Sequence, residues 1–302
     1  MLISKSTKQH SLPIRAFFYI LRIPERIFNR FIFYPSLDRK ITKSDLQLFV
    51  HDKQRGLMRV INYGERLHWT LDSGKVCDAV PWLDRIEPLI SSNDIVFDIG
   101  ANIGVVTNWF AHRCQHVHAF EPHPDNFETI KSQQELRNMK NITLHDIALG
   151  KDNSKMQLHV KRFHGHHSLG DVASSQTVGR IEVNVRTVDE IFEELKIDKI
   201  NFMKIDVEGF ESDVLRGASG LLQNKKIDYI LFEIQDTILR SINKTSREAF
   251  QLIFDAGYQI IDLNGNPVID SDSTETNGDY LACLDGKATA KKLAHSDYKL
   301  ND

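Results

Sequence analysis

Short apolar runs alternate with longer helical patterns through the middle of the chain. Apolar runs of strand length end at Asp98, Glu121 and His145, and helical patterns lie near 105–113 and 124–138. Strands of five to eight residues that alternate with helices of about ten or more are typical of parallel βαβ units. This part of the pattern therefore predicts three parallel strands joined by helices.

A second set of similar elements follows. Strand patterns lie at 201–206 and 227–234, and helical patterns lie near 210–223 and 246–256. Two further strand patterns, 258–263 and 280–284, are typical of a terminal hairpin that runs antiparallel to the rest. Together the elements predict a doubly wound, mostly parallel α/β sheet of seven strands, with an antiparallel terminal strand and helices on both faces.

The chain divides into segments around this pattern. Residues 94–285 hold the α/β domain, which 151–186 interrupts with two alternating strands and a long polar loop, so a hairpin insertion is predicted. Residues 1–40 predict a basic, aromatic helical extension, 41–93 a small lead-in and 286–302 a polar tail. Because a polar loop of such length in a compact domain is most often functional or mobile, the insertion is a candidate part of the site.

Positive charge is concentrated at the N-terminus. The whole chain has a net charge of −3, whereas residues 1–40 carry eight Lys and Arg against two Asp and Glu, a net of +6. The chain as a whole therefore offers no bulk electrostatic attraction for nucleic acid. Its composition, 41% hydrophobic and 26% charged, is ordinary for a globular protein.

Aromatic side chains in 14–34 are interleaved with arginines, and a helix would bring Arg22, Arg26 and Arg30 near one face. The longest apolar run there, Ala16 to Leu21, has six residues, too few for a membrane-spanning helix or a signal peptide. The segment fits peripheral membrane contact, or packing on its own domain or on a second subunit. Three widely spaced cysteines favour reduced thiols, so the predicted location is the cytoplasm, at the inner face of a membrane if 14–34 binds lipid.

The stretch from Val96 to Thr107 runs from a strand, through a loop with Gly100 and Gly104, into a helix. Strand, glycine-rich loop and helix in this order are typical of sites for nucleotide-like ligands. The two glycines lack the G-x-G-x-x-G spacing of a dinucleotide site, which disfavours a nicotinamide-dependent reductase. Asp98 and Glu121 end adjacent predicted strands, so both should lie at the crevice of the sheet.

These two acidic residues restrict the ligand. Glu121 is placed to accept hydrogen bonds from two ribose hydroxyls and to repel a 2′-phosphate, and Asp98 is placed to meet a cation or to order the loop amides. S-adenosyl-L-methionine fits, because it has a bare ribose, an ammonium and a sulfonium, and no phosphate. The alternatives are that Asp98 is a helix N-cap or turn residue and that Glu121 is a solvated strand end.

Six segments occur in an order that resembles one family. They read "VFDIGANIGVVT", "VHAFEPHPDNF", "HDIALG", "VRTVDEI", "MKIDVEGFESDVLRGASGLL" and "YILFEIQ". In wording and order they resemble the FkbM-type methyltransferases, which depend on S-adenosylmethionine and have the Rossmann-like class I fold. The resemblance covers about 94–263, and it implies an enzyme that transfers a methyl group.

The resemblance also implies the roles of individual residues. It implies eight cofactor-binding residues near the ends of the first three strands. The methionine part would be surrounded by Asp98, Gly100, Asn102 and Gly104. The ribose would contact Glu121 and Pro122, and the adenine would contact Asp146 and Ile147. It places Asp206 and Glu208 at the reacting methyl group. Because a hydroxyl acceptor must lose a proton, a nearby carboxylate can act as a base. Asp206 is the first candidate base or substrate-orienting residue, followed by Glu208 and Glu233.

Three histidines, His164, His166 and His167, lie in the loop of the insertion. They could supply a base or a substrate contact, hold a metal ion, or belong to a polar loop without a chemical role. No carboxylate or cysteine accompanies them at a set spacing, so no metal site is predicted. His167 is retained as a catalytic candidate.

The favoured function is O-methylation of a hydroxyl on a sugar, a glycan or another secondary metabolite. This acceptor class comes from the family resemblance alone, since no spacing in the sequence indicates it. The alternatives are N-methylation of an amine on the same fold and a non-catalytic module that binds S-adenosylmethionine. The expected partner is a small-molecule or glycan acceptor, and no nucleic acid partner is expected.

Overall fold

The computed structural model describes residues 82–161, 167–170, 177–269 and 277–294, together with three short N-terminal strands. The chain divides into two compact units, of which the larger comprises Pro81–Gln134 and Asn138–Asp302. In the smaller unit, β1 (Leu2–Ser4), β2 (Leu48–Asp52) and β3 (Gly56–Val60) pair antiparallel in that order. The fold and the site described below belong to the larger unit.

An eight-stranded sheet forms the centre of the larger unit, in the order β13-β12-β14-β11-β10-β4-β5-β6. Five of its strands are mutually parallel: β4 (Ile95–Ile99), β5 (His116–Phe120), β6 (Ile142–His145), β10 (Ile200–Ile205) and β11 (Ile227–Ile234). The strand order reverses between β4 and β10. In an open α/β sheet such a switch point is where ligands bind, beyond the carboxyl ends of the strands.

The terminal strands refine the sequence prediction. The predicted hairpin pairs β12 (Gln259–Asp262) with β14 (Gly278–Cys283), and β14 lies antiparallel between β11 and β12. Because β12 is antiparallel to β14 and β14 to β11, β12 runs in the direction of the parallel strands, contrary to the prediction. An eighth strand, β13 (Pro267–Val268), has two residues and is too short to leave a pattern in the sequence. The mixed, mostly parallel fold class is confirmed.

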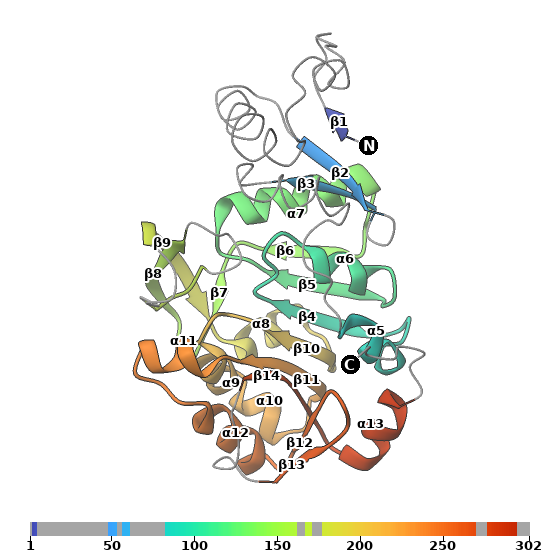
Figure 1. The fold of residues 1–302 in the computed structure, drawn as a ribbon, viewed down its shortest axis with the longest axis vertical. Coiled ribbons are helices and arrows are strands. Elements are labelled where there is room, and N and C mark those ends of the chain that lie inside the picture. The colour runs from blue at the N-terminus through green and yellow to red at the C-terminus, as the bar shows by residue number, and fades with distance from the viewer. Residues whose placement is uncertain are drawn as a thin grey trace, which may run out of the picture. The chain divides into compact units, whose positions relative to one another are not determined.

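Helices cover both faces of this sheet (Figure 1). Those before β10 are α5 (Leu83–Ile86), the 3-10 turn η2 (Glu87–Leu89), α6 (Val105–Ala111), α7 (Pro124–Arg137) and α8 (Val188–Leu195). Those after it are α9 (Glu211–Gly217), α10 (Ser219–Gln223), α11 (Asp236–Ser241), α12 (Ser246–Asp255) and α13 (Gly286–Leu293). The stretch predicted as one helix over 210–223 is thus two helices, and the predicted polar tail begins with α13.

The parallel strands are apolar on both faces because helices cover both. In β10, Phe202, Met203 and Ile205 are completely buried, as are Val96 and Phe97 in β4. Continuous apolar runs of this kind distinguish buried parallel strands from half-exposed antiparallel ones. This composition explains why the central strands could be predicted from the sequence.

The insertion forms its own small sheet. Strand β8 (Ser154–Lys161) pairs antiparallel with β9 (Thr177–Arg186), and β9 also pairs with the two-residue β7 (Ala148–Leu149). Figure 1 shows this sheet beyond the carboxyl ends of β4, β5 and β6. The insertion therefore lies at the same edge of the main sheet as the switch point.

Candidate functional site

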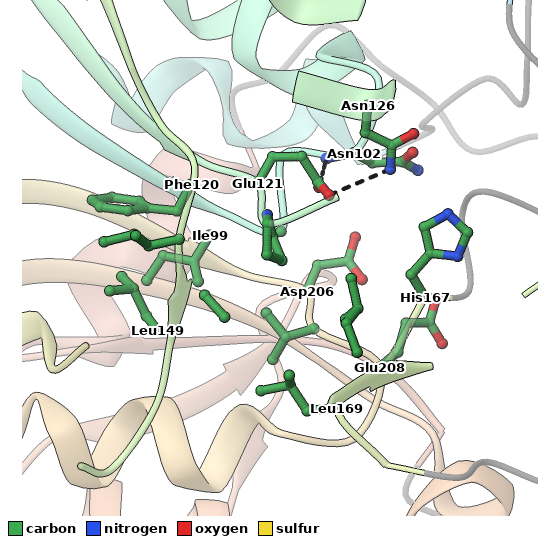
Figure 2. A pocket seen from close by; sticks show the side chains of 16 residues that line it. Ile99, Asn102, Phe120, Glu121, Asn126, Leu149, His167, Leu169, Asp206 and Glu208 are labelled. Carbon is green, nitrogen blue, oxygen red and sulfur yellow. Dashed lines mark hydrogen bonds between the residues drawn. The ribbon is translucent and has the colours of Figure 1, made fainter. Parts of the chain in front are cut away.

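A pocket that is partly open to solvent lies at the switch point. Its lining comes from the ends of β4, β5 and β10, the loops that follow them, and the insertion. Figure 2 shows the polar groups of Glu121, Asn126 and Asp206 directed toward one part of this space, while Phe120 and Leu149 lie at the opposite side. The pocket thus has a polar part and an apolar part.

The loop after β4 has a backbone shape that depends on glycine. Gly100 has φ +78°, and a Cβ atom built on it would lie 1.9 Å from the backbone oxygen of Asp206. Gly104 has φ +81°, and its Cβ would lie 3.0 Å from a side-chain carbon of Ile130. Positive φ angles are strained for other residues, and Asn102, with φ +53°, is one of the few types that tolerate them. The loop therefore needs glycine at 100 both for its φ angle and for close contact with the β10 end.

Glu121 is buried at the end of β5 and holds the loop from the other side. Its Oε2 accepts a hydrogen bond from the Asn102 backbone N–H at 2.8 Å, and its Oε1 accepts from the His123 backbone N–H at 2.9 Å and from Asn126 Nδ2 at 3.4 Å. Burial raises the pKa of Glu121 to about 7, although these hydrogen bonds oppose the shift. A carboxylate offers about four acceptor positions, so about one remains for a ligand hydroxyl.

Lys204 joins the two carboxylates that flank the glycine loop. Its Nζ lies 3.2 Å from Asp98 Oδ1 and 3.3 Å from Asp206 Oδ2, and it donates to the Gly100 carbonyl oxygen at 3.2 Å. Asp98 also accepts a hydrogen bond from Thr107 Oγ1 at 2.6 Å. Burial alone would lower the pKa of Lys204, but Asp206 and Asp98 outweigh burial and raise it. Lys204 therefore stays charged and fixes Asp206 beside the pocket.

Four charged side chains share one face of the sheet near its carboxyl edge. Asp98 on β4 is in register with Lys204 on β10, and Glu233 on β11 is in register with Asp279 on β14. Side chains alternate between faces along each strand, and the β10–β11 register puts both pairs on the same face. Asp98 thus meets a cation, as the sequence predicted, but that cation is a side chain of the same chain.

The two outer carboxyl groups of this set are shifted toward the neutral form. Burial, and next the negative charge of Asp206, raise the pKa of Glu233 to about 8 and the pKa of Asp279 to about 6. At neutral pH Glu233 is mostly protonated, whereas Asp279 is mostly ionised. Glu233 is therefore suited to donate a hydrogen bond, and it is a weaker candidate for a base than Asp206.

The turn after β10 is held by two buried contacts. Glu211 Oε1 accepts from the backbone N–H groups of Gly209 at 3.1 Å and Val207 at 3.3 Å, and burial raises the pKa of Glu211 to about 7. Ser168, from the insertion, donates through Oγ to the backbone oxygen of Glu208 at 2.7 Å. Glu208 itself has φ +54°. The turn that carries Asp206 and Glu208 is therefore fixed from both sides.

His167 approaches the pocket from the insertion. Its Nδ1 accepts a hydrogen bond from the Lys161 backbone N–H at 3.0 Å, and its ring lies 4.3 Å from that of His123. Because Nδ1 is an acceptor here, the proton of the neutral ring is on Nε2. In this arrangement His167 presents a hydrogen-bond donor, which does not suit the predicted role of a base.

The structure brings together eight of the twelve residues that the sequence singled out. The pocket lining includes Gly100, Asn102, Glu121, Pro122, Ile147, His167, Asp206 and Glu208. Four others do not line it: Asp98 is buried against Lys204, Gly104 packs on Ile130, Glu233 lies farther along the sheet in register with Asp279, and Asp146 is exposed. The apolar side chain of Ile147 faces the pocket in place of the carboxylate before it.

Three residues that shape the site were missed from the sequence. Lys204 carries a signal in hindsight, because it is the one charged residue in the otherwise apolar and polar-neutral run Ile200–Ile205. Asn126, on the first turn of α7, and Glu211, at the start of α9, resemble ordinary polar residues of helix N-termini. Only their hydrogen bonds to Glu121 and to the turn after β10 distinguish them.

Some predictions fall outside the residues that the structure describes, namely those on His164, His166 and the segment 14–34. Within the described residues, no group of three or more His, Cys, Asp or Glu side chains could hold a metal ion. Among the described helices, none combines the length and the apolar character that crossing a lipid bilayer requires.

The doubly wound sheet, with a carboxylate-lined pocket at its switch point, defines a Rossmann-like α/β protein. The model of the FkbM methyltransferase domain matches residues 98–260, more than half of the chain. The chain therefore belongs to the FkbM methyltransferase family, which confirms the family predicted from the sequence motifs.

Two methyltransferases are similar in sequence to about half of this chain. Methyltransferase 1 of Beauveria bassiana is 25% identical over 175 residues, which cover 51% of this chain and 66% of the relative. Hexuronic acid methyltransferase AglP of Haloferax volcanii is 27% identical over 148 residues, which cover 47% of this chain and 56% of AglP. The chain thus spans between about half and two thirds of the length of these relatives.

Solved structures of methyltransferases are also similar. An FkbM methyltransferase from Methylobacillus flagellatus KT has a TM-score of 0.42 and 18% identity, over 64% of this chain and 44% of that one. Fibrillarin from Aeropyrum pernix, solved with natively bound S-adenosyl-L-methionine, has a TM-score of 0.36 and 15% identity, over 78% of this chain and 93% of fibrillarin.

Proposed function

We propose that this methyltransferase uses S-adenosyl-L-methionine to O-methylate a hydroxyl of a sugar, a glycan or another secondary metabolite. One observation carries the choice of cofactor: the described lining of the pocket includes Glu121, Asp206 and Glu208 but no lysine or arginine. A dinucleotide would bring phosphates into this negative field without a cation to receive them. S-adenosylmethionine brings a positive charge and a ribose without phosphate.

The residues present fit this cofactor. Glu121 retains about one acceptor position, enough for one ribose hydroxyl where the sequence predicted two, so the second hydroxyl needs another partner. The apolar side chains of Ile147, Leu149 and Leu158 line the pocket and suit a flat adenine ring. Asp206, held by Lys204, places a carboxylate where a sulfonium would be stabilised.

The chain's own residues would align the acceptor and take its proton. When bound, the cofactor supplies a methyl group that is already activated by the sulfonium, so catalysis consists mainly of positioning. The pocket would hold the acceptor hydroxyl beside Asp206, and the Asp206 carboxylate would accept the hydroxyl proton as the acceptor oxygen is methylated. Asp206 suits this role because its carboxylate lines the pocket and is held in place by Lys204, whereas Glu233 is mostly protonated at neutral pH.

The variant Asp206→Asn tests this assignment. Loss of a general base lowers turnover by about 100-fold or more, while affinity for S-adenosylhomocysteine should stay within a few-fold of wild type. Transfer of a labelled methyl group to a panel of sugars, glycans and lipid extracts measures turnover, and calorimetry measures affinity. Turnover at the wild-type rate would show that Asp206 is not the base.

A further inference from the structure

A second cleft, of about 360 Å³, lies between α5 and the strands β12 and β14. Its volume falls within the range of small-molecule sites, which is about 300–1,000 Å³. Trp82 and Arg85 form one wall, the turn that contains Asn264 forms another, and Asn277 and Asp279 lie at the start of β14. The cofactor pocket has a different lining, and no residue lines both cavities.

Hydrogen bonds fix the walls of this cleft to each other. Arg85 Nη1 donates to the Leu263 backbone oxygen at 2.8 Å and to Asn264 Oδ1 at 2.5 Å, which ties α5 to the turn after β12. Asp262 Oδ1 accepts from the backbone N–H groups of Asn264 and Asn266, both at 2.8 Å, and so shapes that turn. Arg85 has no carboxylate within ion-pair distance among the described residues, and both of its hydrogen-bond acceptors are neutral.

Asp279 connects the cleft to the reacting carboxylates. Asp279 lines the cleft and is in register with Glu233. The negative charge of Asp206 raises the pKa of both of these carboxyl groups. Asp206 lines the cofactor pocket. The carboxyl groups of Asp206, Glu233 and Asp279 therefore form a set that extends from the cofactor pocket to this cleft.

The chemistry of the lining indicates the acceptor. A half-buried tryptophan offers an apolar face to a ring, while Asn277, Asp279 and the remaining donors of Arg85 offer hydrogen bonds around it. A sugar ring presents an apolar face and a rim of hydroxyl groups, which matches this combination. The negative field of Asp279 and Asp206 opposes a carboxylated ring, so an uncharged ring fits better.

We propose that this cleft is the acceptor site and that it holds an uncharged, hydroxyl-bearing sugar ring, with Trp82 against the ring and Arg85 and Asp279 on its hydroxyls. The proposal rests on the proposed function, because it needs a methyl donor in the neighbouring pocket. It adds which residues select the acceptor and which class of acceptor they select.

Binding of simple sugars tests the proposal without knowledge of the natural acceptor. Saturation-transfer NMR and calorimetry would measure methyl hexopyranosides of gluco, galacto and manno configuration, and the matching uronosides, on the full chain saturated with S-adenosylhomocysteine. We expect at least one uncharged hexopyranoside to bind. Trp82→Ala should weaken that binding by about tenfold, and Trp82→Phe should retain most of it.

Two controls separate this proposal from the proposed function. The first control is Leu284→Ala. Leu284 is exposed and follows the end of β14 that is remote from Asp279, so this variant should keep the wild-type affinity for the hexopyranoside and for S-adenosylhomocysteine. All variants should bind S-adenosylhomocysteine as the wild type does. If S-adenosylhomocysteine binds but no uncharged hexopyranoside does, if uronosides bind better, or if Trp82→Ala binds the sugar normally, the cleft proposal is wrong. If S-adenosylhomocysteine itself fails to bind, the proposed function is wrong, and the cleft proposal is wrong with it.

Discussion

Lys204 is the residue on which the geometry of the site depends most. It is 3% exposed and lies between the fully buried carboxylate of Asp98 and the partly exposed carboxylate of Asp206, so the charges of Lys204 and Asp98 are both taken from water. A buried ion pair of this kind contributes little net stability, but removal of one partner leaves the other charge unpaired. Lys204 therefore matters both for folding and for the position of the Asp206 carboxylate.

Lys204→Met should lower the free energy of unfolding by about 3–5 kcal/mol, because it leaves Asp98 buried without a cation. Urea unfolding, followed by circular dichroism, measures the loss. Lys199→Met is the matched control: Lys199 pairs with Asp228 at 2.5 Å but is 43% exposed, so its loss should amount to less than about 1 kcal/mol. Equal effects of the two variants would show that the buried ion pair does not have the role assigned to it.

For single residues, the positions of the acidic side chains at the site were easier to predict from the sequence than the groups with which they pair. Glu121, Asp206 and Glu208 could be located because they end strands whose apolar runs are plain, and the ends of parallel strands converge. That Asp98 would be neutralised by Lys204 depends on the register of β4 with β10. A single sequence holds no record of that register, so the ligand-facing and protein-facing acids could not be told apart.

At the scale of elements, the loop after β4 and the end of β10 must approach each other closely. The Asp206 backbone N–H donates to the Ile99 backbone oxygen at 3.1 Å, and the Asp206 backbone oxygen occupies the space beside the Gly100 Cα. The loop beside the proposed cofactor pocket is therefore packed directly on the turn that carries Asp206, the proposed base. A change at Gly100 should affect both.

Gly100→Ala should abolish binding of S-adenosylhomocysteine and lower the thermal midpoint, because its Cβ would lie 1.9 Å from a backbone oxygen and its φ is +78°. Calorimetry and thermal unfolding measure the two effects. Gly179→Ala is the control, since its Cβ would meet its nearest neighbour at 4.0 Å, and both properties should stay near wild type. Normal binding by Gly100→Ala would mean that the loop does not shape the cofactor site.

The central elements were predictable and the peripheral ones were not. Buried strands such as β10 and β11 are continuous apolar runs, and the spacing of the apolar residues and the length of each run identify them in the sequence. The direction of β12 was missed because it follows from β14 lying between β11 and β12, a pairing between segments remote in sequence. The break between α9 and α10 was missed because the stretch 210–223 keeps a helical pattern across it.

At the scale of the whole molecule, a group of histidines on β5 and β6 should limit stability in acid. His118 Nδ1 lies 3.2 Å from His145 Nε2, and the His118 ring lies 4.8 Å from that of His116. Burial, and next the neighbouring His116 and His145, lower the pKa of His118 to about 3 from its ordinary value of 6.5. His118 must therefore stay neutral in the folded state.

The sign of the pH effect follows from this shift. Below pH 6.5 the His118 side chain is protonated in the unfolded chain but stays neutral in the folded chain. The contribution of this group to the free energy of unfolding is therefore complete above pH 6.5 and is lost as the pH falls toward 3. Between pH 7 and pH 5 this single group should remove about 2 kcal/mol from the free energy of unfolding. His118→Phe should flatten this pH dependence in urea unfolding, whereas the exposed His112→Gln should leave it unchanged. An unchanged slope in His118→Phe would contradict the assignment.

We propose that the pocket between β4, β5 and β10 binds S-adenosylmethionine through Glu121. Isothermal titration with S-adenosylhomocysteine and with NADH, on wild type and two variants, tests it most directly. We expect that S-adenosylhomocysteine binds and that NADH does not. Glu121→Ala should weaken binding by about 10- to 100-fold, and Glu128→Ala, exposed on α7, should not weaken it. If the protein binds NADH but not S-adenosylhomocysteine, or if Glu121→Ala keeps the wild-type affinity, the pocket does not bind S-adenosylmethionine through Glu121.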